Sequence, residues 1–244
     1  MKNLFLISSS RYQGGEFYAH CLSSLKDFLG IPKKERSRIV FIPYADPDKD
    51  YDRYTKTASE PFKKLGYELF GVHSYNFPAD CFYDDSVAGV CIGGGNTWLL
   101  QDILWKFGFH EAINGKVSCG EWKYIGASAG TVMACPSMLT TNDMAPILPS
   151  TDKAIGLVPF QINPHFVSGV LVQKHMGETR EERIRQMIVC NPDWQVIGLP
   201  EGCWIEGKDK KYILRGTGQG VIFRKDGNNS IWQPAEFYDK VGML

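Results

Sequence analysis

The sequence predicts an α/β protein with a mostly parallel sheet that is flanked by helices. Short apolar runs bounded by turn residues recur along the first half of the chain, and stretches with helical spacing separate them. This alternation is typical of βαβ units, whose strands pair in parallel. Beyond about residue 195 the pattern changes to short strands joined by turns rich in Gly, Lys and Asp. That change predicts a C-terminal antiparallel extension of the same sheet.

The strands expected in the parallel part are short and apolar. They are Leu4–Ile7, Ile39–Ile42, Glu68–Val72, Val87–Ile92 and Tyr124–Ile125. Between the first two, apolar side chains repeat at helical spacing from Phe17 to Leu29, and Gly30 with Pro32 ends that helix. The strands expected in the extension are Val196–Leu199, Cys203–Ile205, Tyr212–Leu214 and Val221–Phe223.

A run of glycines follows the expected strand that ends at Ile92. Gly93-Gly94-Gly95 precedes an apolar helical stretch that begins at Trp98, and Asn96 or Thr97 is its expected N-cap. The run has neither the Lys-Ser/Thr of a P-loop nor the spacing of a dinucleotide fingerprint. It is either a flexible turn or a loop that brings backbone N–H groups close to a reacting carbonyl.

The last parallel strand runs directly into Gly126-Ala127-Ser128-Ala129-Gly130, where a serine lies between two glycines. This is the layout of a nucleophile elbow. The glycines remove the Cβ clashes of a strained strand-to-helix turn, and the serine oxygen is left exposed at a helix N-terminus. Ser128 is therefore the expected nucleophile. The N–H groups of Gly94, Gly95 and Ala129 are the expected donors to the oxyanion.

A serine nucleophile needs a base within hydrogen-bond reach, and the chain has five histidines. His165 follows Gln161-Ile162-Asn163-Pro164 at an expected strand end, where an open α/β sheet collects its site residues. It is the preferred base, and the alternative is an ordinary loop histidine. His20 and His110 fit packing or surface positions in helices, and His175 lies in a polar loop.

Two carboxylates are candidates for orienting the histidine. Asp143 lies in Thr140-Thr141-Asn142-Asp143-Met144, and Glu201 closes an apolar run in Gly198-Leu199-Pro200-Glu201-Gly202. Each could instead cap nearby backbone N–H groups in a turn. The residues by themselves leave this choice open.

Arg180 lies in the first turn of a helix that is expected to begin near Gly177. At i, i+4 spacing it shares a helix face with Ile184 and Ile188. Because that face is apolar and also includes Met187, it is expected to point toward the protein interior. A cation in the first turn opposes the helix dipole, so helix stability does not explain it. One interpretation is a structural ion pair or a stem that extends to water. The other is a carboxylate receptor, for which the guanidinium fork is suited.

The composition narrows the class of protein. The chain has 27 Lys and Arg residues and 27 Asp and Glu residues. Its formal net charge of zero gives no electrostatic attraction for nucleic acid or an anionic membrane. A small molecule or peptide is therefore the expected partner. The seven scattered cysteines contain no C-x-x-C pair, which argues against disulfides and a zinc site and favours the cytoplasm. Leu4–Ile7 is too short for a signal sequence or a membrane span.

Several of these motifs, in this order, closely resemble the peptidase E family of serine peptidases, the α-aspartyl dipeptidases related to cyanophycinases. The matching motifs are Tyr124–Gly130, Cys135-Pro136, Thr140–Met144, Ile162–Phe166, Gly177–Glu181 and Gly198–Gly202. The likeness covers nearly the whole chain. It implies a fold similar to the class I glutamine amidotransferase domain, which is flavodoxin-like with three layers. It also implies a single catalytic domain over residues 1–244 and is compatible with a homodimer.

The resemblance implies a hydrolase that releases an N-terminal aspartate from Asp-Xaa dipeptides and needs no metal or organic cofactor. The motif matches imply a triad of Ser128 as nucleophile, His165 as base and Glu201 as the orienting acid. One departure from the family pattern is Ala127, where tryptophan is frequent. The backbone turn is expected to persist there, with a pocket wall that is smaller or refilled.

The resemblance also implies two substrate-binding residues, and Asn96 is a third candidate. Arg180 matches the arginine that recognises the carboxylate of the substrate aspartate. Asp143 matches an aspartate that holds the substrate ammonium or supports the histidine. Asn96, beside the glycine-rich loop, is expected to contact the substrate as well.

Other functions fit parts of the pattern. A cyanophycinase-like or isoaspartyl hydrolase would use the same triad with the substrate carboxylate presented differently. A non-catalytic member of the fold would use the glycine-rich loop and Arg180 only to hold an acidic metabolite. A glutaminase is less consistent, because the elbow carries Ser128 and Cys135 lies two helical turns further along.

Overall fold

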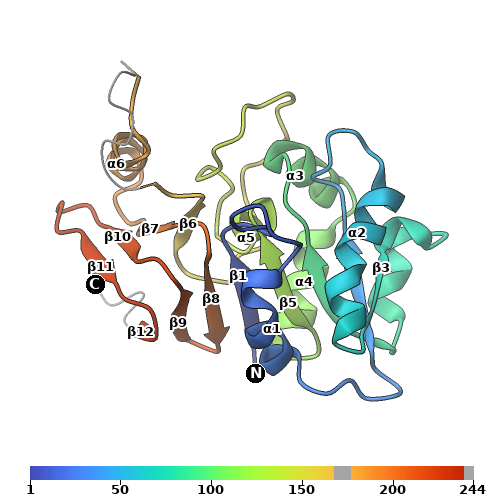
Figure 1. The fold of residues 1–244 in the computed structure, drawn as a ribbon. Helices are drawn as coiled ribbons and strands as arrows, with labels where there is room; N and C mark the ends of the chain where they lie inside the picture. The colour runs from blue at the N-terminus through green and yellow to red at the C-terminus, as the bar shows by residue number, and fades with distance from the viewer. Residues whose placement is uncertain (168–176, 239–244) are drawn as a thin grey trace.

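The centre of the main sheet consists of parallel strands formed by the apolar runs. The computed structural model describes residues 1–167 and 177–238, and Figure 1 shows how their helices and strands are arranged. The parallel strands are β1 (Asn3–Ile7), β2 (Arg38–Ile42), β3 (Glu68–Gly71), β4 (Val87–Ile92) and β5 (Lys123–Ala127). They lie in the order β1-β5-β4-β2-β3, and all neighbours pair in parallel, as predicted.

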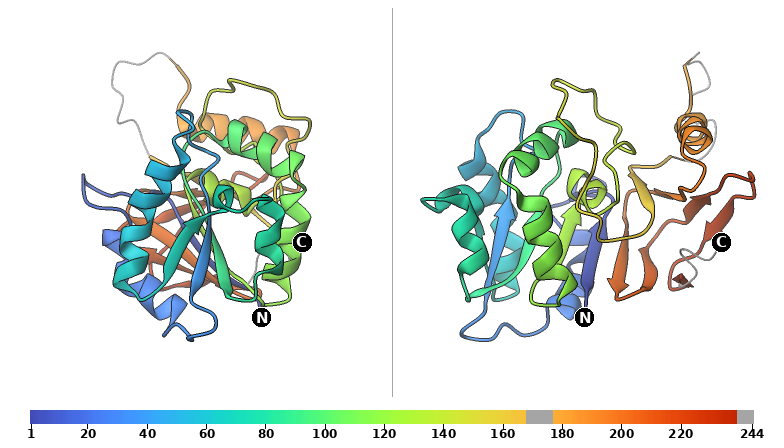
Figure 2. Two further views of the ribbon diagram at one scale, coloured as in Figure 1. Left: turned by 90° about the vertical axis from the view of Figure 1, so that its right-hand side faces the viewer. Right: turned by 180° about the vertical axis from the view of Figure 1, so that it is seen from behind.

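Helices cover both faces of this sheet, as the two views in Figure 2 show. One face carries α1 (Leu22–Leu29) and α2 (Tyr51–Lys64), and the other carries α3 (Thr97–Lys106) and α4 (Phe109–Ser118). Successive residues of a strand point to opposite faces. Phe5 therefore packs in one buried cluster with α1 and α2, while Leu4 packs in another with α3 and α4. The result is the predicted arrangement of three layers.

The first helix begins later than its apolar spacing predicts. A 3-10 turn, η1 (Ala19–Cys21), precedes α1, and Tyr18 before it has a φ of 56°. A residue in this left-handed region interrupts a helical path, so the regular helix begins only at Leu22. Gly30 ends it, as predicted. Two further turns, η2 (Val72–Ser74) and η3 (Pro78–Tyr83), connect β3 to β4, so Val72 lies outside the strand expected to contain it.

The C-terminal strands divide between two sheets. Three strands extend the main sheet beyond β1 in antiparallel pairing, namely β8 (Cys203–Lys208), β9 (Lys211–Gly216) and β12 (Phe237–Tyr238). Four others form a second sheet in the order β11-β10-β7-β6. These are β6 (Gln161–Pro164), β7 (Val196–Leu199), β10 (Gly220–Phe223) and β11 (Ser230–Trp232).

The prediction of one continuous extension is therefore wrong for Val196–Leu199 and Val221–Phe223. The edge of β1 is occupied by β8, and a turn in which Cys203 N–H donates to Pro200 O separates β7 from β8. With that edge taken, β7 pairs in parallel with β6 and antiparallel with β10.

The ends of four strands meet at one place in the molecule. β5 ends before Ser128, β6 before His165 and β7 shortly before Glu201. Pro164 of β6 is paired with Leu199 of β7, so the residues that follow them lie close together. Ser128 N–H donates to the carbonyl of Ile7 at the end of β1. The topology thus gathers the candidate residues at the carboxyl ends of parallel strands, where open α/β sheets place their sites.

Within residues 1–167 and 177–238, none of the helices combines the length and the apolar character that a membrane span requires.

Candidate active site

Ser128 occupies a strained turn between β5 and the short helix α5 (Ala129–Met133). Its φ of 51° and ψ of −109° are rarely adopted by residues other than glycine. The flanking glycines permit the turn, because a Cβ on Gly126 would lie 2.5 Å from Gly130 O and a Cβ on Gly130 would collide with Ile92 O. The backbone therefore has the elbow geometry that the motif predicts.

A chain of hydrogen bonds connects the serine, the histidine and the glutamate. Ser128 Oγ lies 2.8 Å from His165 Nε2, and His165 Nδ1 lies 2.6 Å from Glu201 Oε1. An ionised carboxylate only accepts hydrogen bonds, so Nδ1–H donates to Glu201 and Nε2 is left to accept from the Ser128 hydroxyl. This arrangement can remove the hydroxyl proton and stabilise the imidazolium that results.

The two candidate acids occupy different environments. Glu201 is the hydrogen-bond partner of His165. Asp143 Oδ2 instead accepts from the backbone N–H of Thr97 at 2.8 Å and from the hydroxyls of Thr97 and Thr141 at 2.6 Å and 2.9 Å. In this respect Asp143 is a turn carboxylate that caps the start of α3. Within the described part of the chain, its Oδ1 accepts no hydrogen bond.

Ser8, which directly follows β1, contacts the candidate site but is not among the residues predicted from the sequence. Its fully buried hydroxyl accepts from His165 N–H at 2.8 Å and donates to Leu199 O at 2.9 Å. His165 has a φ of 53°, a conformation that such a contact helps to hold. Ser8 therefore connects the ends of β1, β6 and β7. The sequence signal is a serine directly after a buried strand, which is too common to identify by itself.

The glycine-rich loop lies beside Ser128 and presents two N–H groups that have no partner in the described part of the chain. Gly93 N–H donates to Ile42 O at 3.3 Å and Asn96 N–H to Ala45 O at 2.7 Å. Among the described residues, the N–H groups of Gly94 and Gly95 have no acceptor, and neither does that of Ala129. A Cβ on Gly94 would lie 3.8 Å from Ser128 Oγ. Free donors next to a nucleophile are what an oxyanion hole requires.

Arg180 is the first residue of α6 (Arg180–Cys190), which begins later than the expected start near Gly177. Thr179 and Glu182 form a capping box there, and such a box fixes the start of a helix. Ile184 and Ile188 are buried, so the face that Arg180 shares points inward, as predicted.

The guanidinium of Arg180 is half-buried and has no hydrogen-bond or ion-pair partner among the described residues. Its Nη1 atom is buried without a hydrogen bond, and the structure gives it no ion pair within residues 1–167 and 177–238. Burial, followed by the charge of Arg183, lowers the pKa of Arg180, while the charge of Asp143 raises it. Asp143 and Arg180 therefore lie close enough to interact electrostatically. The interpretation as a structural ion pair has no support among these residues.

Asn96 caps α3, as one of the two sequence alternatives predicts. Its Oδ1 accepts from Trp98 N–H at 3.1 Å and from Leu99 N–H at 3.2 Å, and its Nδ2 donates to Met144 O at 3.0 Å. Both polar side-chain atoms are thus occupied. A contact between Asn96 and substrate stays a prediction.

The other histidines that the structure describes have partners other than Ser128 and Glu201. His110 is buried, with Nε2 2.9 Å from Gln101 Oε1, and His73 Nε2 lies 3.0 Å from Asp52. His20 packs between the rings of Tyr12 and Trp204. His175 lies outside the described residues.

Two further features bear on the sequence predictions. Ala127 is fully buried in the cluster that contains Phe5 and Trp204, so its side chain packs in the core rather than in a pocket wall. No group of three or more metal-binding side chains occurs in the parts of the chain that the structure describes.

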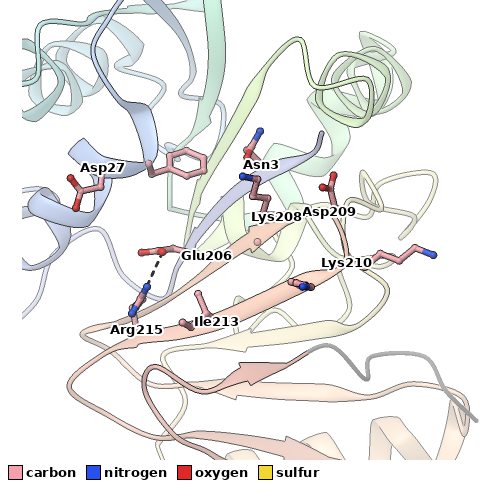
Figure 3. Close-up of a pocket in the computed structure, with 11 residues that line it drawn as sticks. Asn3, Asp27, Glu206, Lys208, Asp209, Lys210, Ile213 and Arg215 are labelled. Atoms are coloured by element: carbon pink, nitrogen blue, oxygen red, sulfur yellow. Dashed lines mark hydrogen bonds and ion pairs between the residues drawn. The ribbon is translucent and has the colours of Figure 1, made fainter.

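A separate open cavity lies far from Ser128. It has a volume of about 890 Å³ and is lined by the start of β1 and the turn between β8 and β9 (Figure 3). Its walls carry both cations and anions, among them Lys208, Asp209 and Arg215. It therefore lies at the amino end of β1, whereas Ser128 lies at the carboxyl end of the adjacent parallel strand.

Comparison with known proteins extends over almost the entire chain. Residues 4–215 match the family model of Peptidase family S51. Peptidase E of Nostoc sp. is 36% identical over 238 residues, which cover 98% of this chain and 96% of the relative. Peptidase E of Haemophilus influenzae is 39% identical over 202 residues, which cover 83% and 90%, respectively.

Solved structures share the fold at lower sequence identity. A peptidase from an acI-B1 Actinobacterium superposes with a TM-score of 0.66 at 17% identity, covering 98% of this chain and 96% of that chain. A protein from Listeria monocytogenes EGD-e superposes with a TM-score of 0.64 at 21% identity, covering 89% and 100%. Together with the family match, these comparisons show that the chain belongs to peptidase family S51 and is a serine-type peptidase.

Proposed function

We propose that this peptidase releases the N-terminal aspartate of Asp-Xaa dipeptides. The observation that carries the proposal is Arg180, whose buried Nη1 atom has no partner among the described residues. A buried donor without a partner is costly, and a substrate carboxylate would satisfy the guanidinium fork with two parallel hydrogen bonds. The resemblance to the peptidase E family supports the same substrate class.

In the proposed mechanism, Ser128 Oγ attacks the carbonyl carbon of the aspartyl residue while His165 Nε2 takes the hydroxyl proton. The N–H groups of Ala129 and of Gly94 or Gly95 stabilise the oxyanion that forms. The C–N bond then breaks, and His165 gives its proton to the leaving amine. Water repeats the sequence on the acyl-enzyme and releases aspartate. Glu201 keeps the imidazole oriented throughout.

Asp143 is proposed to hold the ammonium group of the substrate. Its Oδ2 atom is taken by Thr97 and Thr141, which fixes the carboxylate and leaves Oδ1 available. The other role considered for it, support of the histidine, is filled by Glu201. The substrate aspartate would then lie between one cation and one anion of the site, with Asn96 at the border of the pocket.

Three dipeptides separate the candidate functions. Asp-Leu should be hydrolysed at least about 30-fold faster than Ala-Leu, because the neutral residue leaves Arg180 unpaired. Faster hydrolysis of β-Asp-Leu than of Asp-Leu would favour an isoaspartyl or cyanophycinase-like hydrolase. Binding of aspartate without cleavage of any dipeptide would favour a non-catalytic receptor.

We also propose a single catalytic domain, a cytoplasmic location and a homodimer. A single catalytic domain is supported by one buried cluster that contains Leu6 of the main sheet and Ile197 and Trp232 of the second sheet. All seven cysteines are free, which supports a cytoplasmic location. The homodimer stays a prediction that sedimentation or light scattering would test.

A further inference from the structure

Tyr54 contacts the same glycine-rich loop that lies beside Ser128. It lies in the first turn of α2, and its hydroxyl donates to the carbonyl oxygen of Gly94 at 2.9 Å. The carbonyl of Gly94 and the N–H of Gly95 belong to one planar peptide unit. One end of that unit is thus bound by a tyrosine, and the N–H at the other end has no acceptor among the residues that the structure describes, in the loop beside Ser128.

The position of the Tyr54 hydroxyl is fixed by packing. Its ring packs edge-on against Phe41 at 5.0 Å and against Phe17 at 6.3 Å. A Cβ on Gly93 would collide with the hydroxyl of Tyr54, so the loop can approach the tyrosine this closely only with glycine at that position. Burial raises the pKa of Tyr54, and the hydroxyl therefore keeps the proton that it donates.

We propose that Tyr54 is a positioning residue for peptide hydrolysis: its hydroxyl fixes and polarises the Gly94–Gly95 peptide unit so that Gly95 N–H donates to the oxyanion. The inference rests on the proposed function, since it assumes acyl transfer at Ser128. A hydrogen bond to the carbonyl of a peptide strengthens its N–H as a donor, because linked hydrogen bonds polarise one another. A donor that is already oriented needs no reorganisation as the oxyanion develops.

The chain provides a matched control in Tyr67. Its hydroxyl also donates to a backbone carbonyl at 2.9 Å, in this case that of Leu29, and the residue is buried. Tyr67 precedes β3 at the amino end of the parallel strands, so it lies at the opposite end of the sheet from Ser128. Tyr54→Phe and Tyr67→Phe therefore remove the same chemical contact at two distant places.

The first measurement is kinetic. Tyr54→Phe should lower kcat for Asp-Leu about 3- to 10-fold, the range expected for one lost hydrogen bond, with little change in KM. It should lower the Ser128-dependent hydrolysis of p-nitrophenyl acetate by a similar factor, after the rate of Ser128→Ala is subtracted. Tyr67→Phe should leave both activities near those of the wild type. Equal losses in the two variants would overturn the proposal.

The second measurement separates positioning of the oxyanion donor from a general loss of structure. A boronic acid analogue of aspartate accepts Ser128 Oγ on boron and becomes a tetrahedral anion with an oxygen in the oxyanion hole. Free aspartate forms no such adduct. Tyr54→Phe should weaken binding of the boronate by the same factor as kcat and leave the affinity for aspartate unchanged. Weakening of both by one factor would show a distorted site and overturn the proposal.

The two hypotheses fail in different ways. A wild-type protein that cleaves no Asp-Xaa dipeptide, but whose ester hydrolysis falls in Tyr54→Phe alone, would overturn the proposed substrate and support the role of Tyr54. A wild-type protein that cleaves Asp-Leu, with Tyr54→Phe equally active, would support the proposed function and overturn the role of Tyr54.

Discussion

At the scale of single residues, Ser128 combines an unfavourable backbone conformation with a hydroxyl that is hydrogen-bonded to His165. Ser128→Ala should lower turnover of Asp-Leu about 10⁴-fold or more, because the acyl-enzyme route is lost. Alanine keeps the backbone and the glycine neighbours, so the thermal unfolding midpoint should stay close to that of the wild type. Steady-state kinetics and circular dichroism provide the two measurements. A variant that kept more than a few per cent of the activity would disprove the nucleophile assignment.

Arg180 is expected to decide substrate selectivity. Arg180→Met keeps most of the stem volume and removes the fork, so it should abolish most of the preference for Asp-Leu over Ala-Leu, roughly 2–5 kcal/mol in the wild type. Arg183→Met is the control, because Arg183 lies on the same helix and makes an exposed ion pair with Glu178 at 4.0 Å. If the two variants discriminated equally well, the aspartate receptor would have to lie elsewhere.

Ser8 is expected to act through the histidine. Ser8→Ala leaves His165 N–H and Leu199 O without their shared partner, which should reduce the free energy of unfolding by about 1–3 kcal/mol. A shift of His165 should lower kcat about 10- to 100-fold with less effect on KM. Ser59→Ala removes another buried serine hydroxyl, in α2 and outside the proposed site. A purely structural role for Ser8 would make the kinetic effects of the two variants alike.

At the scale of elements, His110 joins three segments of the chain. Its Nε2 atom meets Gln101 of α3, whose amide donates to the carbonyls of Thr151 and Lys153. Burial is the main cause that lowers the pKa of His110. The unfolded chain therefore binds this proton more readily than the folded protein does, and the stabilisation is lost as the pH falls below about 6.5.

His110→Gln should flatten the dependence of unfolding free energy on pH in that range. Denaturant titrations between about pH 7.5 and 5.5 would measure it, with the unfolded-state pKa of about 6.5 as reference. The wild type should lose stability across this interval and the variant should lose less. An identical slope in both proteins would mean that His110 titrates alike in the folded and unfolded states.

Some elements of this fold are specified by local sequence, whereas others depend on distant parts of the chain. The parallel strands were predictable because each is a short apolar run with both faces buried. The start of α6 was present in the sequence as Thr179-Arg180-Glu181-Glu182, a capping-box pattern. The second sheet was not predictable, since the partner of β7 depends on β8 having taken the edge of β1. That competition involves strands almost 200 residues apart in the chain.

The residues of the proposed site also differ in how far the sequence could predict them. Ser128 and its glycines form a local motif, so the sequence could indicate them. The association of His165 with Glu201 rather than Asp143 follows from the parallel register of β6 and β7. Ser8 and Tyr54 contact the site through hydrogen bonds to backbone atoms. Such contacts leave little signal in a single sequence, because serine and tyrosine are common residues and no local motif distinguishes Ser8 or Tyr54 from the others.

At the scale of the whole molecule, the buried cluster that links the two sheets predicts cooperative unfolding. Leu6, Ile197 and Trp232 share it, so neither sheet should remain folded without the other. Loss of peptidase activity and loss of far-UV circular dichroism should therefore coincide in a urea titration. Two separated transitions would contradict the proposal of a single catalytic domain.

The central place of β1 also sets an order of events during synthesis. β1 is synthesised before β5 and β8, yet it lies between them, and β8 leaves the ribosome some 200 residues later. Glu201 emerges directly before β8. Under the proposed assignment, a nascent chain carries its serine long before it can activate it. Activity can arise only after the segment from β6 to β8 has been synthesised and has folded back onto β1.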